Sequence, residues 1–453
     1  MKKLFLYLLL VIVGFPLQAQ TNYKYRISLA DKEGTGYAVD HPEEFLSERA
    51  LERRERQQLP IDSTDLPVSW VYLEGLTNIG AKIVTTSKWN NTAVVQVVDT
   101  LLVEQMAKLP FVTKVKKVWV QPDSIPPRDE KRKKEVTNKV EKGTDYYGKG
   151  YQQIHIHGGD SLHKAGFAGQ GMHVAIIDAG FYNADHIKFF KNMQLLGTRD
   201  FVNPQSDIYA ENSHGMKVLS CMAANSPQAF VGTAPEAAYW LLRSEDADTE
   251  QPVEEDYWAA AIEFADSVGV DVINTSLGYY SFDEGYEAYR YCDLDGHYSL
   301  MSHTASMAAD KGMVVVCSAG NAGNDTWKKI TPPADAENVI TVGALTRELT
   351  NTVFSSLGNT TDGRIKPDVM AIGGNATVSS TGGTVSRANG TSFASPILCG
   401  VVACFWQACP WLTAKQVVKT VQQAGDRVDF PDNVYGYGIP DLWKAYQKEL
   451  NNQ

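Results

Sequence analysis

Four short motifs in this chain carry residues that can take part in nucleophilic catalysis. The apolar run 174–177 leads into Asp178, a helical pattern begins at His214, a second apolar run leads into Asn321, and Ser392 lies in Gly-Thr-Ser-Phe-Ala-Ser-Pro at 390–396. A serine becomes a nucleophile when a base takes its proton, and a carboxylate can orient that base. An amide that donates to the developing oxyanion completes such a site. These residue types predict acyl transfer if the fold brings the four positions together.

Ser392 has two interpretations when its motif is taken alone. The run 393–406 is rich in Ala, Val and Ile and is typical of a helix, so Ser392 stands at a helix N-terminus. Serine commonly caps helices at this place. The same place offers unpaired backbone N–H groups and the positive end of the helix dipole, which stabilise negative charge. A cap needs no partner, whereas a nucleophile needs the base, the acid and the oxyanion donor.

The motifs and their order Asp, His, Asn, Ser resemble those of the subtilisin-like serine proteases, the subtilases of peptidase family S8, over about residues 146–446. The resemblance implies that Asp178 orients the base His214, that Ser392 is the nucleophile, and that Asn321 is the oxyanion donor. It also implies a substrate-binding strand and pocket, which would be lined by Ser276, Leu277, Gly278, Ala319 and Gly320. The alternative for that segment is an ordinary buried strand end, and the two interpretations are compatible.

Two features differ from the family pattern. Met216 and Lys217 stand where the family usually has Thr and His, and these positions support the helix more than the chemistry. The loop 225–232 matches one that binds calcium in some relatives, but it carries no carboxylate, and hard cations prefer charged oxygen ligands. We therefore expect no cofactor, no metal and no calcium there.

Three histidines close in sequence could in principle suggest a metal site. They are His155, His157 and His163. They have no carboxylate partner in a recognisable ligand spacing, so we interpret them as incidental.

The N-terminus predicts export. Residues 1–19 combine a basic start, a short apolar run and a small residue at Ala19, as in a secretory signal peptide. The alternative is a membrane anchor, but the apolar run is too short to span a bilayer comfortably. A secreted or periplasmic protein without a membrane anchor after signal removal follows from this reading.

Charge is distributed unevenly along the 453 residues. The formal net charge is −11, and it divides into about +2 for residues 21–150 and −15 for residues 151–453, with +2 from the signal segment. An acidic main body argues against nucleic-acid binding. Six cysteines in an exported chain permit disulfides, but four of them lie in apolar patterns, so mostly free thiols are expected.

The length predicts two or three domains. Residues 20–121 show the pattern β-α-β-β-α-β with one extra strand, which suits a small ferredoxin-like α+β domain. The expected strands are 23–29, 68–73, 82–86, 93–98 and 112–120, and the expected helices are 41–57 and 100–109. Its position resembles that of the inhibitory propeptide of secreted subtilases; an accessory domain is the alternative. Residues 122–149 are Pro-rich and charged, and they predict an exposed linker with the processing region.

Residues 150–453 predict an α/β catalytic domain with a mostly parallel sheet and helices on both faces. Strands are expected at 173–177, 238–242, 270–274, 313–317 and 339–342, and helices at 214–224, 254–268, 300–311 and 392–407. Ligands bind beyond the carboxyl ends of the strands in such folds, and Asp178 and Asn321 follow two expected strands.

The function hypothesis is a secreted serine endopeptidase, monomeric and made as a self-processing precursor with its own propeptide as inhibitor and peptides or proteins as substrates. A catalytically silent peptide-binding pseudo-protease is the alternative from another class, and the four intact chemical residues argue against it. Peptide ligation through the same acyl-enzyme is a third hypothesis.

Overall fold

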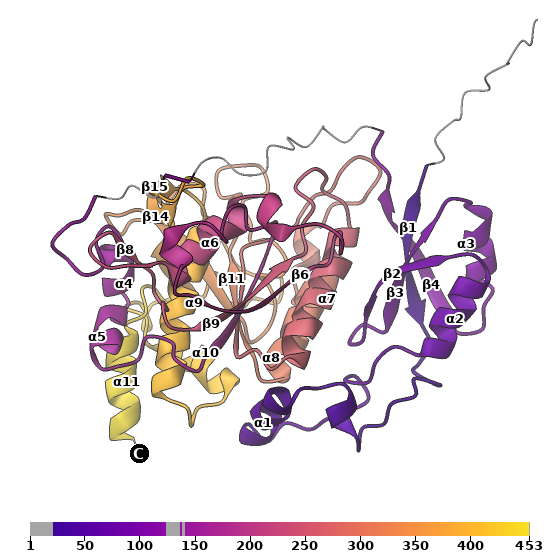
Figure 1. Ribbon diagram of the computed structural model, residues 1–453, viewed down its shortest axis with the longest axis horizontal. Coiled ribbons are helices and arrows are strands. Elements are labelled where there is room, and N and C mark those ends of the chain that lie inside the picture. The colour runs from indigo at the N-terminus through magenta and orange to yellow at the C-terminus, as the bar shows by residue number, and fades with distance from the viewer. Residues whose placement is uncertain (1–20, 124–135, 138–140, 453) are drawn as a thin grey trace, which may run out of the picture.

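The N-terminal domain is built on a four-stranded antiparallel sheet in the order β2-β3-β1-β4 (Figure 1). The computed structural model describes residues 21–123, 136–137 and 141–452. In this domain the elements are β1 (Tyr23–Leu29), η1 (Pro42–Glu44), α1 (Glu48–Arg56), α2 (Trp70–Asn78), β2 (Lys82–Ser87), β3 (Thr92–Val97), α3 (Leu101–Met106) and β4 (Val112–Val120). The strand order and the two crossovers through α2 and α3 confirm the ferredoxin-like prediction.

The alternation of β3 explains how this sheet serves two cores. Ala93, Val95 and Val97 pack with Leu76 of α2 and Met106 of α3, whereas Val94 on the other face packs into a core of the larger α/β domain that follows. Successive strand residues point to opposite faces, so an apolar run buries both sides of the sheet.

Two predictions for this domain were wrong. The segment 68–73 is not a strand; its β-branched and aromatic residues form the start of α2, where Tyr72 stacks on Phe111 at 4.4 Å between ring centroids. Tertiary packing outweighed the local strand preference. The single helix expected over 41–57 is divided, because Ser47 caps α1 by accepting from the amide of Ala50 at 3.3 Å.

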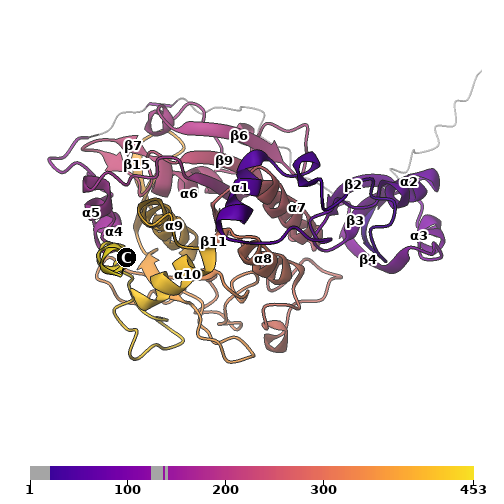
Figure 2. The ribbon, with the colours of Figure 1, turned by 90° about the horizontal axis from the view of Figure 1, so that it is seen from below.

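The segment 42–66, which we call the α1 arm, leaves the N-terminal sheet and lies against the α/β domain (Figures 1 and 2). Arg53 and Arg54 are almost fully buried, and both donate to the carboxylate of Asp266, at 2.5 and 2.8 Å. Gln57 donates to the carbonyl of Gly312 at 2.8 Å. The domain is therefore docked at two places, through its sheet and through this arm.

The α/β domain contains a seven-stranded parallel sheet in the order β13-β12-β11-β10-β5-β9-β6. Its strands are β5 (His173–Asp178), β6 (Gln194–Asp200), β9 (Ala238–Arg243), β10 (Val272–Thr275), β11 (Val314–Ser318), β12 (Ile340–Leu345) and β13 (Val369–Ile372). The central strands are buried continuously, as expected for a parallel sheet covered on both faces.

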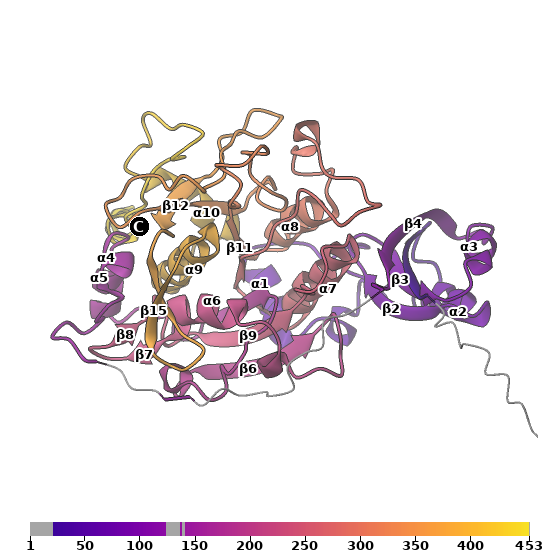
Figure 3. The same cartoon turned by 90° about the horizontal axis from the view of Figure 1, so that it is seen from above.

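Helices cover both faces of this sheet, as the sequence predicted. The face with Val174 and Ile176 packs against α6 (His214–Ala223) and α9 (Thr391–Ala408). The face with Ala175 and Ile177 packs against α7 (Val253–Ser267) and α8 (Leu300–Asp310). Seen from above, the N-terminal domain lies on the α7 and α8 side (Figure 3).

The remaining elements are short or lie at the edge of the domain. They are α4 (Tyr151–His155), α5 (Gly159–Lys164), η2 (Lys188–Phe190), η3 (Ile208–Ala210), β7 (Asn225–Ser226), β8 (Phe230–Val231), η4 (Tyr291–Asp293), β14 (Ala376–Ser379), β15 (Val385–Ala388), α10 (Ala414–Gln423) and α11 (Leu442–Asn451). The sequence analysis predicted the five central strands and the four long helices to within a few residues, and it missed β6, β13 and α10.

Within the described residues, α9 is long and apolar enough to cross a membrane by composition, but 94% of it is buried in the domain. It is the central helix of the core. The predicted signal peptide at 1–19 and most of the first half of the predicted linker lie outside the described residues.

Candidate active site

Asp178, which is buried, and His214, which is partly exposed, form a hydrogen-bonded pair at the carboxyl edge of the sheet. Asp178 is the last residue of β5 and is fully buried, and His214 is the first residue of α6. The Nδ1 atom of His214 lies 2.8 Å from Oδ1 of Asp178. The same oxygen accepts from the amide of Ala179 at 2.8 Å, which fixes the carboxylate. With Nδ1 engaged, Nε2 of the imidazole is the nitrogen left for chemistry.

Gly215 explains how α6 can begin so close to β5. A Cβ atom at this position would lie 2.5 Å from the carbonyl oxygen of Gly180 and 2.8 Å from Cβ of Asp178. Only glycine allows the helix and the strand to approach to this degree. The glycine after His214 therefore belongs to the geometry of the pair.

Ser392 lies in the first turn of α9 and does not cap it. The N-cap residue is Gly390, at φ 151°, and it makes no side-chain cap. The hydroxyl of Ser392 lies 3.4 Å from the carbonyl oxygen of Ser276, while the carbonyl of Ser392 accepts from Oγ of Ser276 at 2.9 Å. The capping interpretation of Ser392 is therefore wrong.

Ser392 and His214 line the same cleft of about 350 Å³, which also contains Asn321. No hydrogen bond joins Ser392 to His214 in the part of the chain that the structure describes. Bonds between nucleophile and base are often long without substrate and tighten when it binds.

The side-chain amide of Asn321 is oriented by the start of α9. Its Oδ1 accepts from the amide of Thr391 at 2.9 Å and from the hydroxyl of Thr391 at 3.0 Å. A backbone N–H can only donate, so it identifies this atom as the oxygen. The NH₂ group of Asn321 is then the part left to donate to a ligand.

The predicted substrate-binding residues divide into two groups. Ser276, Leu277, Gly278 and Gly320 line the cleft. Ala319 does not; it is fully buried, and its backbone bonds to Val342 and Thr331. The expected contact at Ala319 is therefore corrected to a supporting position, because the side chain of a residue at this strand end points into the core.

Several cleft residues were missed by the sequence analysis because they lie on loops without a motif. They are Glu245, Glu250, Asp325 and Thr331. Thr331 lies so close to Gly278 that a Cβ there would be 2.3 Å from its Oγ1, so the narrow backbone of Gly278 is required.

The charge of His214 depends on its neighbours. Burial alone would lower the pKa of His214, but the carboxylate of Asp178 and its hydrogen bond outweigh burial and raise that pKa above the ordinary value. Glu245, which is half-buried nearby, has its pKa raised to about 8 by burial and by the negative charge of Asp178.

The three histidines considered for a metal do not meet. His155 pairs with Asp160 at 3.2 Å, Nδ1 of His157 lies 3.1 Å from the carbonyl of Pro440, and Nε2 of His163 lies 3.0 Å from that of Thr233. No group of three His, Cys, Asp or Glu suited to a metal ion occurs among residues 21–123, 136–137 and 141–452. The six cysteines are unpaired thiols, and only Cys292 is exposed.

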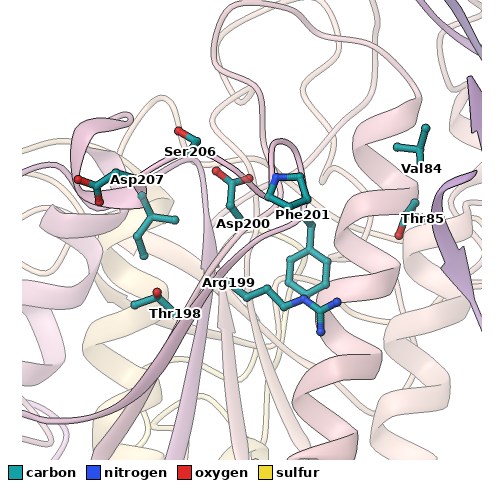
Figure 4. Close-up of a pocket in the computed structure, with 10 residues that line it drawn as sticks. Val84, Thr85, Thr198, Arg199, Asp200, Phe201, Ser206 and Asp207 are labelled. Carbon is teal, nitrogen blue, oxygen red and sulfur yellow. The ribbon is translucent and has the colours of Figure 1, made fainter. Parts of the chain in front are cut away.

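A second cavity, of about 410 Å³, lies between the two domains (Figure 4). Val84 and Thr85 of β2 face Arg199, Asp200 and neighbouring residues of the catalytic domain across it. The carboxylate of Asp200 is occupied by Arg243 at 2.9 Å and by two backbone amides. No histidine or cysteine is among its described lining residues, and the hydroxyl of Ser206 there donates to the carboxylate of Glu211, so we interpret the cavity as an interdomain space.

The fold and the cleft together define a class of protein. A seven-stranded parallel sheet, with a histidine–carboxylate pair, a serine and an amide at its carboxyl edge, is the subtilisin-like α/β arrangement. A family model of the subtilase family matches residues 169–438, and a model of the Bacteroidota peptidase S8 propeptide domain matches residues 24–137. The chain belongs to the subtilase family and carries the family's propeptide domain.

Curated relatives agree with this assignment. Serine protease AprX of Bacillus subtilis (strain 168) is 30% identical over 298 residues, which cover 60% of this chain and 65% of AprX. Subtilisin DY of Bacillus licheniformis is 30% identical over 297 residues, which cover 64% of this chain and 95% of that protein. The matched region thus spans just under two thirds of AprX and nearly all of subtilisin DY.

Proposed function

We propose that this protein is a secreted or periplasmic serine endopeptidase that hydrolyses peptide bonds through an acyl-enzyme on Ser392. The observation that carries the proposal is the 2.8 Å hydrogen bond between the buried Asp178 and His214, which lines the same cleft as Ser392 and Asn321. Membership of the subtilase family supports it.

In the proposed reaction, Nε2 of His214 takes the proton of Ser392 as Oγ attacks the peptide carbonyl carbon. The carbonyl oxygen becomes an oxyanion that accepts from the NH₂ of Asn321 and the amide of Ser392 at the start of α9. His214 then gives the proton to the leaving amine. Water, activated by His214, hydrolyses the ester, and Asp178 stays ionised beside the imidazolium.

The substrate would bind as an extended strand along the backbone of 276–278, with one side chain in the pocket beside Gly320. The absence of a side chain at Gly278 leaves room for this backbone approach. Leu277 is almost fully buried, so its backbone is the part that would meet the peptide.

We further propose that residues 1–19 are a signal peptide that directs export and that residues 20–121 are a propeptide that inhibits the enzyme. The linker 122–149 would contain the processing site, and residues 150–453 would form the monomeric mature enzyme. The docking of the N-terminal sheet supports this arrangement: Arg26 donates to both oxygens of Asp256, at 2.6 and 2.7 Å, in a buried bidentate pair. Glu263 accepts from the amides of Lys88 and Trp89, at 2.7 and 3.1 Å.

The proposal is tested by labelling the purified protein with a fluorophosphonate probe and by following cleavage of a quenched peptide library. We expect Ser392 to be labelled and the library to be cut, and we expect the Ser392→Ala variant to do neither. Peptide binding without labelling would support the pseudo-protease. Product masses that include an added amine acceptor would support ligation.

A further inference from the structure

Three carboxylates are among the residues that line the cleft containing Ser392. Glu245 and Glu250 lie in the loop between β9 and α7, and Asp325 lies in the loop after β11. All three line the cleft that contains His214 and Ser392, and no Lys or Arg is among its described lining residues.

Among the described residues, no Lys or Arg forms an ion pair with these three carboxylates. Arg243, two residues before Glu245, is committed to Asp200 at 2.9 Å and to two further carboxylates at 3.5 and 3.7 Å.

The surroundings of Glu245 and Glu250 disfavour the ionised forms of these two carboxyl groups. Burial and the neighbouring Asp283 raise the pKa of Glu250 to about 7, and the pKa of Glu245 is raised as described above. A cation placed among such carboxylates favours their ionised forms and is itself stabilised. A divalent ion is not indicated, because no three described His, Cys, Asp or Glu are grouped to hold one.

The end of the N-terminal sheet lies close to this acidic side of the cleft. β4 ends at Val120, whose amide and carbonyl both bond to the side chain of Gln251, at 2.8 and 3.1 Å, and Gln251 directly follows Glu250 in the sequence.

We propose that the cleft selects peptides with Lys or Arg close to the bond that is cut, and that Glu245 and Glu250 determine this specificity. This inference rests on the proposed peptidase function and names its substrate class. A Lys or Arg side chain entering the cleft meets unpaired carboxylates at short range in a partly desolvated space, where opposite charges attract more strongly than in water. An acidic side chain meets repulsion there.

The test uses the processed enzyme and pairs of quenched peptides that differ only by Lys or the neutral isostere norleucine at one position on the amino side of the scissile bond. We expect kcat/KM to favour the Lys peptide by about 10–100-fold at one or more positions, as for close charge pairs at other interfaces. The E245Q/E250Q double variant should lower this ratio at least about tenfold, and Glu250→Asp should preserve most of it. Glu348→Gln, an exposed acid outside the cleft, is the control and should keep the wild-type ratio.

The specificity proposal would be overturned if the Lys-to-norleucine ratio of kcat/KM were near one in the wild type at every position, or if E245Q/E250Q had the same ratio as the wild type. Either result would leave the peptidase proposal unaffected. If no peptide is cut and Ser392 is not labelled, the peptidase proposal fails instead. The charge preference is then read from the dissociation constants of fluorescent Lys and norleucine peptides. Equal constants overturn it, and tighter Lys binding that E245Q/E250Q removes supports it.

Discussion

Asp178 both orients the imidazole of His214 and sets its charge. A general base works in its neutral form, and the pKa of His214 is raised by Asp178 despite burial. A group with a raised pKa binds its proton over a wider range, so base catalysis is present above that pKa and is lost as pH falls through it.

We therefore expect the acid limb of the kcat/KM profile to lie above the ordinary histidine value of about 6.5. In Asp178→Asn the cause of the rise is removed and burial remains, so the limb should move to lower pH. The maximal rate should fall about 10⁴-fold, as in another triad with the equivalent change. A pH–rate series on both proteins checks this, and an unmoved limb would mean that another group limits the rate.

Asn321→Ala should lower kcat about 10²–10³-fold with little change in KM, because the lost NH₂ stabilises only the oxyanion; this magnitude comes from the equivalent subtilisin asparagine. Steady-state kinetics separate the two constants. A change confined to KM would place Asn321 in substrate binding alone.

The preference for Lys over norleucine should rise with pH between about 6 and 8.5, because Glu250 and Glu245 ionise over that range. The other titratable or charged groups that interact with them are Asp178, His214, Arg243, Glu254, Tyr279 and Asp283. The loss of base catalysis when His214 is protonated affects both peptides equally and cancels in the ratio of kcat/KM, whereas the charge of His214 lowers the pKa of Glu245 and so acts on the ratio. A ratio independent of pH would show that these carboxylates do not titrate there.

The approach of helix α6 to strand β5 is what creates the Asp178–His214 pair, and Gly215 permits it. Gly215→Ala should destabilise the domain by about 1–3 kcal/mol through overpacking and reduce activity further by displacing His214. Denaturant unfolding and peptide cleavage measure the two effects. Gly382→Ala, where the nearest atom to a Cβ is 3.8 Å away, is the matched control.

The α1 arm holds the N-terminal domain through a carboxylate of helix α7. Asp266 binds Arg53, Arg54 and Lys88, all from the N-terminal domain. Asp266→Asn leaves the buried guanidinium of Arg53 without its ion-pair partner and leaves Arg54 with Asp65 alone, so we expect the precursor to lose about 3–5 kcal/mol of unfolding free energy. The processed enzyme without that domain should lose little.

Asp310→Asn is the comparison for this loss. Asp310 pairs with Lys415 at 2.7 Å, but both side chains are more than half exposed. Exposed pairs contribute about 0–1 kcal/mol, so this variant should stay near wild type. Equal losses in the two variants would contradict the importance of the arm.

The whole molecule joins a propeptide domain to a catalytic domain through two docking places and a linker. If the linker 122–149 is cut by Ser392, the wild type should purify as two fragments and Ser392→Ala as one full-length chain. Mass spectrometry locates the cut. Normal processing of Ser392→Ala in a protease-free preparation would exclude self-cleavage.

The released N-terminal fragment, added back to the processed enzyme, should inhibit it in a dose-dependent manner. Its sheet and its arm bury ion pairs with α7, which supports tight rebinding. A folded fragment without inhibitory effect would favour the accessory-domain interpretation.

The local sequence was enough to predict the order of the four motifs, the five central strands and the long helices. The central strands are apolar runs that are buried on both faces of the sheet, and the long helices have a strong apolar pattern. Gly215 after His214 and Gly390 before the predicted helix could also be identified in the sequence as parts of the motifs. The family resemblance came from the same short motifs.

The features that the sequence did not predict depend on contacts between residues that are far apart in the chain. The segment 68–73 became α2 because its side chains pack against Phe111 and the N-terminal sheet, although their intrinsic preference is for a strand. The edge strand β6 was missed because it is partly exposed and lacks a clear apolar pattern, and β13 was missed because its apolar run is only four residues long. The three carboxylates of the cleft, Glu245, Glu250 and Asp325, could not be predicted to lie together from the sequence. They belong to loops up to 80 residues apart, which only the parallel sheet brings to one edge.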